Sequence, residues 1–339
     1  MADIKDWQSL GELDDEWIAT AKAAGESPDL GLLPNIAAMR DFLENAKNAM
    51  AQAMAPPSFP DVKEQDHKVK MRDGHEIDVR TYHPQNASAP GPLGVMYHGG
   101  GWCIGDLTGE DLLCKLMASK LGMNVVNVDY RLGPEWKFPT AHNDCWDATK
   151  WAAANAAALG ADPSKGFTIG GTSAGGNITA TISHLARDEN LSPPITGCHL
   201  MIPALCDISA YPEQYKKDLL SRGQLPNAPI LSNAAMELFS NNYIEPKDRS
   251  DPLFSPLLWK TGHKGLPPQY FQICGADPLR DEALVYERIL REDEGTKTKV
   301  DVYAGQPHGY WDIFPQMSAS KKFVEESVKG IQWLLEQKN

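Results

Sequence analysis

Ser173 is the first residue whose type and setting could support nucleophilic chemistry. It lies in the sequence GGTSAGG, where Gly171 and Gly175 flank it in a G-x-S-x-G pattern. The apolar run 167–169 precedes it and predicts a strand, while 177–187 predicts a helix. Small flanking residues allow a tight turn between strand and helix with the hydroxyl at its apex. The dipole of the following helix would favour negative charge developing there.

A serine hydroxyl needs a base to take its proton, and a carboxylate usually orients that base. His308 in the sequence QPHGY follows a predicted strand, and we predict it to be the base. Asp277 directly follows another predicted strand, so we predict it to be the acid. Asp281 competes for this role. It lies with Glu282 where the next helix begins, however, and carboxylates there commonly cap the helix.

The oxyanion of an acyl-transfer transition state needs backbone N–H donors. The sequence HGGG at 98–101 follows a short apolar strand and has no bulky side chain after its histidine. Ala174 directly follows the proposed nucleophile, so its N–H is a further candidate donor. The alternative interpretation of three consecutive glycines is a flexible turn.

The order of the elements predicts an α/β fold. Strands alternate with helices from about residue 93 onward, which favours a mostly parallel central sheet with helices on both faces. Ligands bind such sheets at the carboxyl ends of the strands. His98, Ser173, Asp277 and His308 each follow a different predicted strand. We therefore expect them to meet at one edge of the sheet.

Four segments are predicted from composition and periodicity. Residues 1–60 have a helical pattern that ends at the sequence APPSFP, and 61–206 form the first part of the α/β core. A proline-rich insertion spans 207–266, and 267–339 complete the core. The two flanking segments are interpreted as a helical cap over a pocket, with simple packing on the core as the alternative.

Composition narrows the possible partners. The 339 residues are 42% hydrophobic and 23% charged, with a formal net charge of −13. That charge argues against nucleic acid or an anionic membrane as partner. No signal peptide or membrane-spanning run is seen, so a cytoplasmic location is expected. The six cysteines are scattered, which favours reduced thiols over a zinc site, and no metal or cofactor is expected.

Several motifs together resemble the hormone-sensitive-lipase-like esterases of the α/β-hydrolase superfamily, known as bacterial family IV. The order Ser, Asp, His matches that arrangement. With Thr172 before the serine, the sequence resembles the GTSAG-motif subgroup of this family. Gly133 stands where the family usually has Ala. The resemblance covers roughly 62–339 and rests on the sequences HGGGW, DYRLGPE, GTSAGGN, DPLRDE and HG.

The resemblance implies roles for single residues. Ser173, Asp277 and His308 would be nucleophile, acid and base. Gly100, Gly101 and Ala174 would be the oxyanion donors, with His98 holding the loop. It also implies short to medium acyl groups, and homodimers through the last strand and the C-terminal helix.

Three functions remain open at this stage. The first is a serine carboxylesterase acting on a small ester, which needs no cofactor. The second is an amide deacetylase or acyltransferase with the same triad, since the triad does not distinguish the bond. The third is a non-catalytic ligand receptor, which would need none of the triad. The expected pocket residues are Trp102, Leu205, Leu279, Tyr310, Trp311, Met39 and Phe42.

Overall fold

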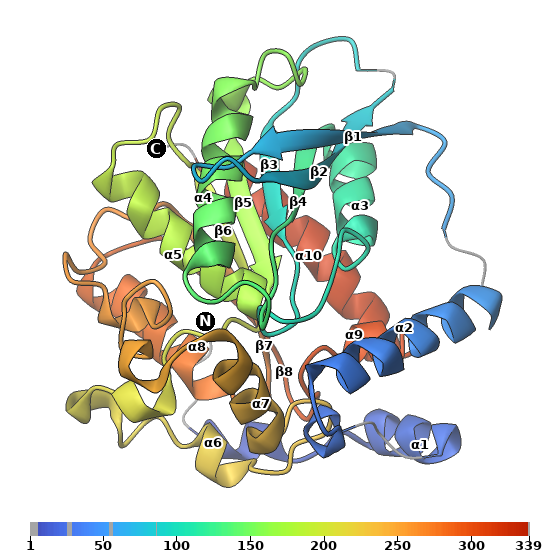
Figure 1. Cartoon of the computed structure of the whole chain (residues 1–339), viewed down its shortest axis with the longest axis vertical. Coiled ribbons are helices and arrows are strands. Elements are labelled where there is room, and N and C mark those ends of the chain that lie inside the picture. The colour runs from blue at the N-terminus through green and yellow to red at the C-terminus, as the bar shows by residue number, and fades with distance from the viewer. Residues whose placement is uncertain (1–5, 26–28, 54–56, 86, 338–339) are drawn as a thin grey trace.

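One sheet organises the molecule (Figure 1). The computed structural model describes residues 6–25, 29–53, 57–85 and 87–337. Its eight strands in these ranges have the order β1-β2-β4-β3-β5-β6-β7-β8. They are β1 (Val62–Lys70), β2 (Glu76–Pro84), β3 (Leu93–Tyr97), β4 (Asn124–Asp129), β5 (Phe167–Thr172), β6 (Gly197–Met201), β7 (Gln269–Cys274) and β8 (Thr298–Tyr303).

The sheet is antiparallel at one edge and parallel elsewhere. The hairpin β1–β2 joins the sheet through the antiparallel pair β2–β4, and all pairs from β4 to β8 are parallel. Every residue of β3 and β7 is buried, as expected for parallel strands covered on both faces. The parallel register places Tyr97 beside Gly171, so the ends of β3 and β5 lie next to each other.

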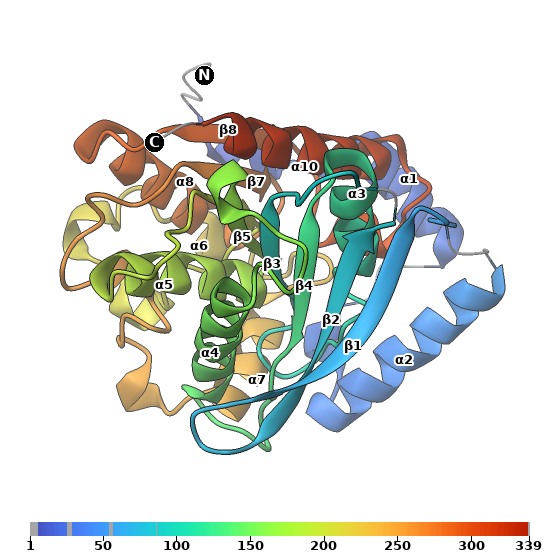
Figure 2. The same ribbon diagram turned by 90° about the horizontal axis from the view of Figure 1, so that it is seen from above.

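Helices cover both faces of the sheet (Figure 2). Helices α4 and α5 pack together on one face, and α3 and α10 pack together on the other. Helix α8 packs against β7. The helices are α1 (Asp15–Ala24), α2 (Ile36–Ala53), α3 (Asp111–Leu121), α4 (Thr140–Ala154), α5 (Ala174–Asp188), α6 (Ser221–Gln224), α7 (Asn233–Tyr243), α8 (Arg280–Arg288), α9 (Tyr310–Ile313) and α10 (Ser318–Glu336).

The segments predicted as a cap lie beyond the carboxyl ends of the parallel strands. Helices α1 and α2 come from the N-terminal segment, and α6 and α7 from the insertion; all four lie on the lower side in Figure 1. Helix α7 packs against α2. The division at 1–60, 61–206, 207–266 and 267–339, and the cap role, stay predictions.

Two findings bear on the composition-based expectations. All six cysteines are free and buried. Within the described ranges, none of the helices has both the length and the apolar character needed to cross a lipid bilayer.

Candidate active site

The turn that carries Ser173 is strained and closely packed. Ser173 has φ 56° and ψ −110°, a backbone conformation that costs roughly 1–3 kcal/mol for a residue with a side chain. Its N–H donates to Met201 O at 2.8 Å. A Cβ on Gly171 would lie 2.4 Å from Tyr97 O, and one on Gly175 would lie 2.0 Å from the same oxygen. Glycine is therefore required on both sides because the end of β3 passes so close.

Ser173, His308 and Asp277 form one hydrogen-bonded chain. His308 Nε2 lies 2.9 Å from Ser173 Oγ, and His308 Nδ1 lies 2.7 Å from Asp277 Oδ2. The other carboxylate oxygen, Asp277 Oδ1, accepts from Leu279 N–H at 2.9 Å. Asp277 and His308 are buried, at 1% and 8% exposure. A carboxylate at Nδ1 favours the tautomer with its proton there, which leaves Nε2 free to accept the serine proton.

The glycine loop after β3 presents unused backbone donors. Gly100 and Gly101 have φ of 118° and 55°, which favour glycine. In the described part of the chain, neither N–H donates to a protein acceptor. A Cβ on Gly101 would enter the ring of Phe239 on α7. Ala174 is the first residue of α5, so its N–H has no partner within the helix.

His98 holds this loop without reaching Ser173. Its Nδ1 lies 2.7 Å from Gly99 O, and its ring stacks on Tyr130 with centroids 4.0 Å apart. Tyr130 OH also donates to His98 O at 2.8 Å. Burial lowers the pKa of His98 to about 4, so the ring is neutral at pH 7.

A cavity of about 430 Å³ opens above Ser173. Of the residues expected to line it, Trp102, Leu279 and Phe42 do so. The other four lie outside its lining and are packed in the core: Leu205, Met39, Tyr310 and Trp311.

Tyr310 and Trp311, which follow the predicted base His308, show why some expected residues lie outside the cavity lining. Tyr310 is fully buried, with its OH donating to Ala319 O at 3.0 Å. Trp311 stacks on Phe323 of α10 with centroids 3.6 Å apart. Both side chains on α9 therefore pack against the C-terminal helix.

Sequence reasoning missed several polar residues of the cavity wall. Glu110, Asp312 and Arg222 line the cavity, together with Thr172, which directly precedes Ser173. Glu110 is only 5% exposed, and burial raises its pKa to about 8. No motif singles out Glu110, Asp312 or Arg222, because each comes from a different loop or helix terminus.

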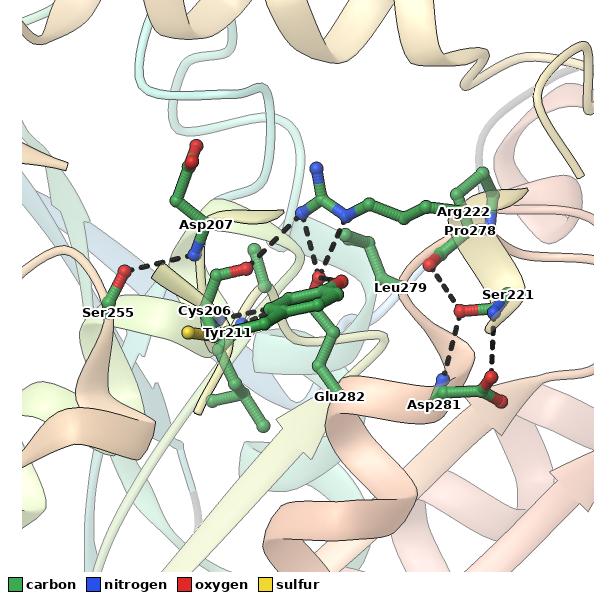
Figure 3. Close-up of polar contacts among 12 residues, drawn as sticks. Cys206, Asp207, Tyr211, Ser221, Arg222, Ser255, Pro278, Leu279, Asp281 and Glu282 are labelled. Atoms are coloured by element: carbon green, nitrogen blue, oxygen red, sulfur yellow. Dashed lines mark hydrogen bonds and ion pairs between the residues drawn. The ribbon is translucent and has the colours of Figure 1, made fainter. Parts of the chain in front are cut away.

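Asp281 and Glu282 do not act as simple helix caps. Asp281 Oδ2 accepts from the N–H groups of Leu220 and Ser221 at 2.8 and 2.7 Å. Glu282 Oε2 accepts from the N–H groups of Leu205 and Cys206 at 2.7 and 2.8 Å. Both carboxylates thus tie the start of α8 to chain that lies about 60 to 80 residues earlier, in and beside the insertion (Figure 3).

The remaining buried histidines have structural partners. His142 Nε2 lies 2.8 Å from Asn177 Oδ1, and His199 Nε2 lies 2.7 Å from Gln272 Oε1. His184 Nε2 lies 2.9 Å from His263 Nδ1. Burial lowers the pKa of His142 and His199 to about 4 and that of His184 to about 3. Within the described ranges, no His, Cys, Asp and Glu cluster could hold a metal ion.

Comparisons with known proteins indicate an α/β-hydrolase fold as well. A family model described as "alpha/beta hydrolase fold" matches residues 94–312. An "AB hydrolase superfamily protein" of Schizosaccharomyces pombe is 42% identical over 305 residues, covering 89% of this chain and 88% of that protein. The versiconal hemiacetal acetate esterase of Dothistroma septosporum is 38% identical over 330 residues, or 96% of each chain.

A solved structure agrees over nearly the whole length. The crystal structure of vibralactone cyclase superposes with a TM-score of 0.88 at 35% identity, covering 97% of this chain and 96% of that one. The predicted α/β fold is thereby confirmed.

Proposed function

The chain belongs to the α/β-hydrolase family, as its motifs indicated, and we propose that it is a serine carboxylesterase acting on short- to medium-chain esters. The single observation that carries this proposal is the hydrogen-bonded chain from Ser173 Oγ through His308 to Asp277. A relative with matching length, named as an esterase, supports the choice of bond. The cavity volume of about 430 Å³ suits a small substrate.

The proposed reaction proceeds in two halves. Ser173 Oγ attacks the ester carbonyl while its proton passes to His308 Nε2. The resulting oxyanion accepts hydrogen bonds from the N–H groups of Gly100, Gly101 and Ala174. The C–O bond to the alcohol then breaks, and His308 returns the proton to the departing oxygen. Water, deprotonated by His308, attacks the acyl-enzyme and releases the acid with Ser173 restored.

Acyl transfer to an acceptor other than water is the second candidate. The same acyl-enzyme would form, and an alcohol or amine would replace water in the second half. The likeness to a solved structure named as a cyclase favours keeping this candidate. Added alcohol that lowers acid release while forming a new ester would identify transfer; unchanged acid release would identify hydrolysis.

The cap and dimer assignments also belong to this proposal. Helices α2 and α7 contribute lining residues, among them Phe42 and Phe239, which supports a cap role for their segments. Strand β8 is an edge of the sheet and pairs only with β7 in the described chain. Such an edge can pair with a second copy. Light scattering on the purified protein distinguishes a dimer from a monomer.

Replacement of the nucleophile tests the central assignment. Ser173→Ala is expected to lower kcat for p-nitrophenyl butyrate at least roughly a thousand-fold, with an unchanged circular dichroism spectrum. Ser183→Ala is a matched control on the helix that follows Ser173, because Ser183 Oγ donates to Ala180 O at 2.7 Å and Ser183 lies outside the cavity lining. The control should retain wild-type activity within the same order of magnitude. Full turnover by Ser173→Ala would refute the proposal.

A further inference from the structure

One cationic side chain of the cavity wall has no part in the ester chemistry. Arg222 lies on α6, within the proline-rich insertion, and lines the same cavity as Ser173. Its side chain is 12% exposed. An arginine this enclosed needs partners for most of its donors.

Glu282 fixes the guanidinium of Arg222 in place. Glu282 Oε1 accepts from Arg222 Nε at 3.0 Å and from Nη2 at 2.7 Å. Tyr211 OH donates to the same oxygen at 3.0 Å, and Arg222 Nη2 also lies 3.4 Å from Cys206 O. Glu282 is in turn held by two backbone N–H groups, so both partners are rigid. A planar guanidinium held on one edge presents its other edge in a fixed direction.

The remaining nitrogen is available to a ligand. In the part of the chain that the structure describes, Arg222 Nη1 donates to no protein acceptor. It points away from Glu282 (Figure 3). Cys206, whose carbonyl oxygen lies 3.4 Å from Arg222 Nη2, is also a cavity residue, as is Leu279.

The charges around Arg222 indicate which acceptor fits. Its positive charge is balanced by Glu282, and Asp207 in the same wall lies 3.8 Å from Arg249. A neutral oxygen could accept from Nη1 without adding charge to this balanced pair. A carboxylate ligand would instead bring a second negative charge beside Glu282, with one guanidinium between the two carboxylates.

We propose that Arg222 Nη1 is a specificity-determining donor for substrates whose acyl or alcohol arm carries a neutral hydrogen-bond acceptor, such as a ketone, ether or hydroxyl oxygen. This inference rests on the proposed esterase function, because it concerns the substrate of the same cavity. A site built around a buried charged donor discriminates against an analogue that lacks the matching acceptor. A purely alkyl arm would leave Nη1 without a partner when it displaces water.

Matched ester pairs test the proposal in the unmodified enzyme. One pair varies the acyl arm, with p-nitrophenyl pentanoate and its ketone analogue, p-nitrophenyl levulinate. A second pair varies the alcohol arm, with acetate esters of an alkyl alcohol and of a keto-alcohol of equal length. We expect kcat/KM to favour the ketone about 10- to 100-fold in one pair, the range for a hydrogen bond to a charged donor. A p-nitrophenyl hemisuccinate should be hydrolysed more slowly than the levulinate.

Variants then assign the preference to this residue. Arg222→Lys keeps a positive charge for Glu282 but removes the second terminal nitrogen, so the ketone preference should fall toward unity. Arg249→Lys is the matched control, since Arg249 is buried in the same insertion and binds Asn241 at 2.8 Å without lining the cavity. That control should keep the wild-type preference. The double variant Arg222→Met with Glu282→Gln removes both charges and should also lose the preference.

The possible results distinguish a failure of the inference about Arg222 from a failure of the esterase assignment. If both members of each pair are hydrolysed at equal rates, the inference about Arg222 is overturned while the esterase assignment stands. A ketone preference that survives in Arg222→Lys, or a faster rate for the hemisuccinate, overturns it as well. If no ester in either pair is hydrolysed, the proposed function itself fails.

Discussion

Asp277→Asn should remove most activity by forcing the wrong tautomer of His308. The side-chain amide keeps its oxygen toward Leu279 N–H, since Asp277 Oδ1 accepts from that group at 2.9 Å. The new NH₂ group then faces His308 Nδ1, 2.7 Å from the position of Oδ2. Nδ1 must accept, so the ring proton moves to Nε2, which can no longer take the proton of Ser173. The loss expected from a wrong tautomer in a serine triad is roughly ten-thousand-fold in kcat, or about 5.5 kcal/mol.

Steady-state kinetics with p-nitrophenyl acetate measures this loss. Asp281→Asn is the matched control from the same motif, since Asp281 binds Leu220 and Ser221 rather than His308. We expect the control to lower kcat less than about tenfold, in line with the loss of an anchoring contact. The tautomer argument is wrong if Asp277→Asn retains more than about a tenth of kcat, or if the two variants lose activity equally.

Two further substitutions test the packing of the site and its electrostatics. Gly175→Ala places a Cβ 2.0 Å from Tyr97 O, a backbone atom that cannot move cheaply. We therefore expect both kcat and Tm to fall. A fully active variant with an unchanged Tm would contradict close packing at the turn that carries Ser173. His142 has a pKa lowered to about 4 by burial, so the unfolded chain takes up its proton below about pH 6.5 while the folded chain does not. Its contribution to stability is therefore present above pH 6.5 and is lost as the pH falls toward 4, by up to about 1.4 kcal/mol per pH unit. Between pH 6.5 and 5, the free energy of unfolding measured in urea should fall by about 1–2 kcal/mol less in His142→Gln than in the wild type. An unchanged pH dependence would contradict a neutral, buried His142.

The elements that carry the triad could be predicted from sequence because their signals are local. The pattern around Ser173 requires glycine where the chain passes Tyr97, and this requirement leaves a readable motif. Apolar runs of five or six residues predict buried parallel strands, and polar residues just after them must share an edge. In the structure, Ser173, Asp277 and His308 do meet, in one hydrogen-bonded chain.

The walls of the cavity could be predicted only in part, through Trp102, Leu279 and Phe42. Tyr310 and Trp311 were expected in the pocket, but α9 is only four residues long, so no periodicity reveals which way its side chains face. Arg222 meets Glu282 across 60 positions in the sequence. Such a pairing depends on where the insertion folds back, and no local pattern records it.

The motif DPLRDE has a consequence for how this enzyme could change its substrate range. Within six residues it holds the partner of His308 and the two carboxylates that bind chain at 205–206 and 220–221. We therefore expect that another segment can replace 207–266 on one condition. It must offer paired backbone N–H groups at 220–221 while those at 205–206 stay in place, whatever side chains it brings to the cavity. Replacements that keep these hydrogen bonds should leave Asp277 undisturbed. Those that lose them should lower the activity even though they touch no reacting atom.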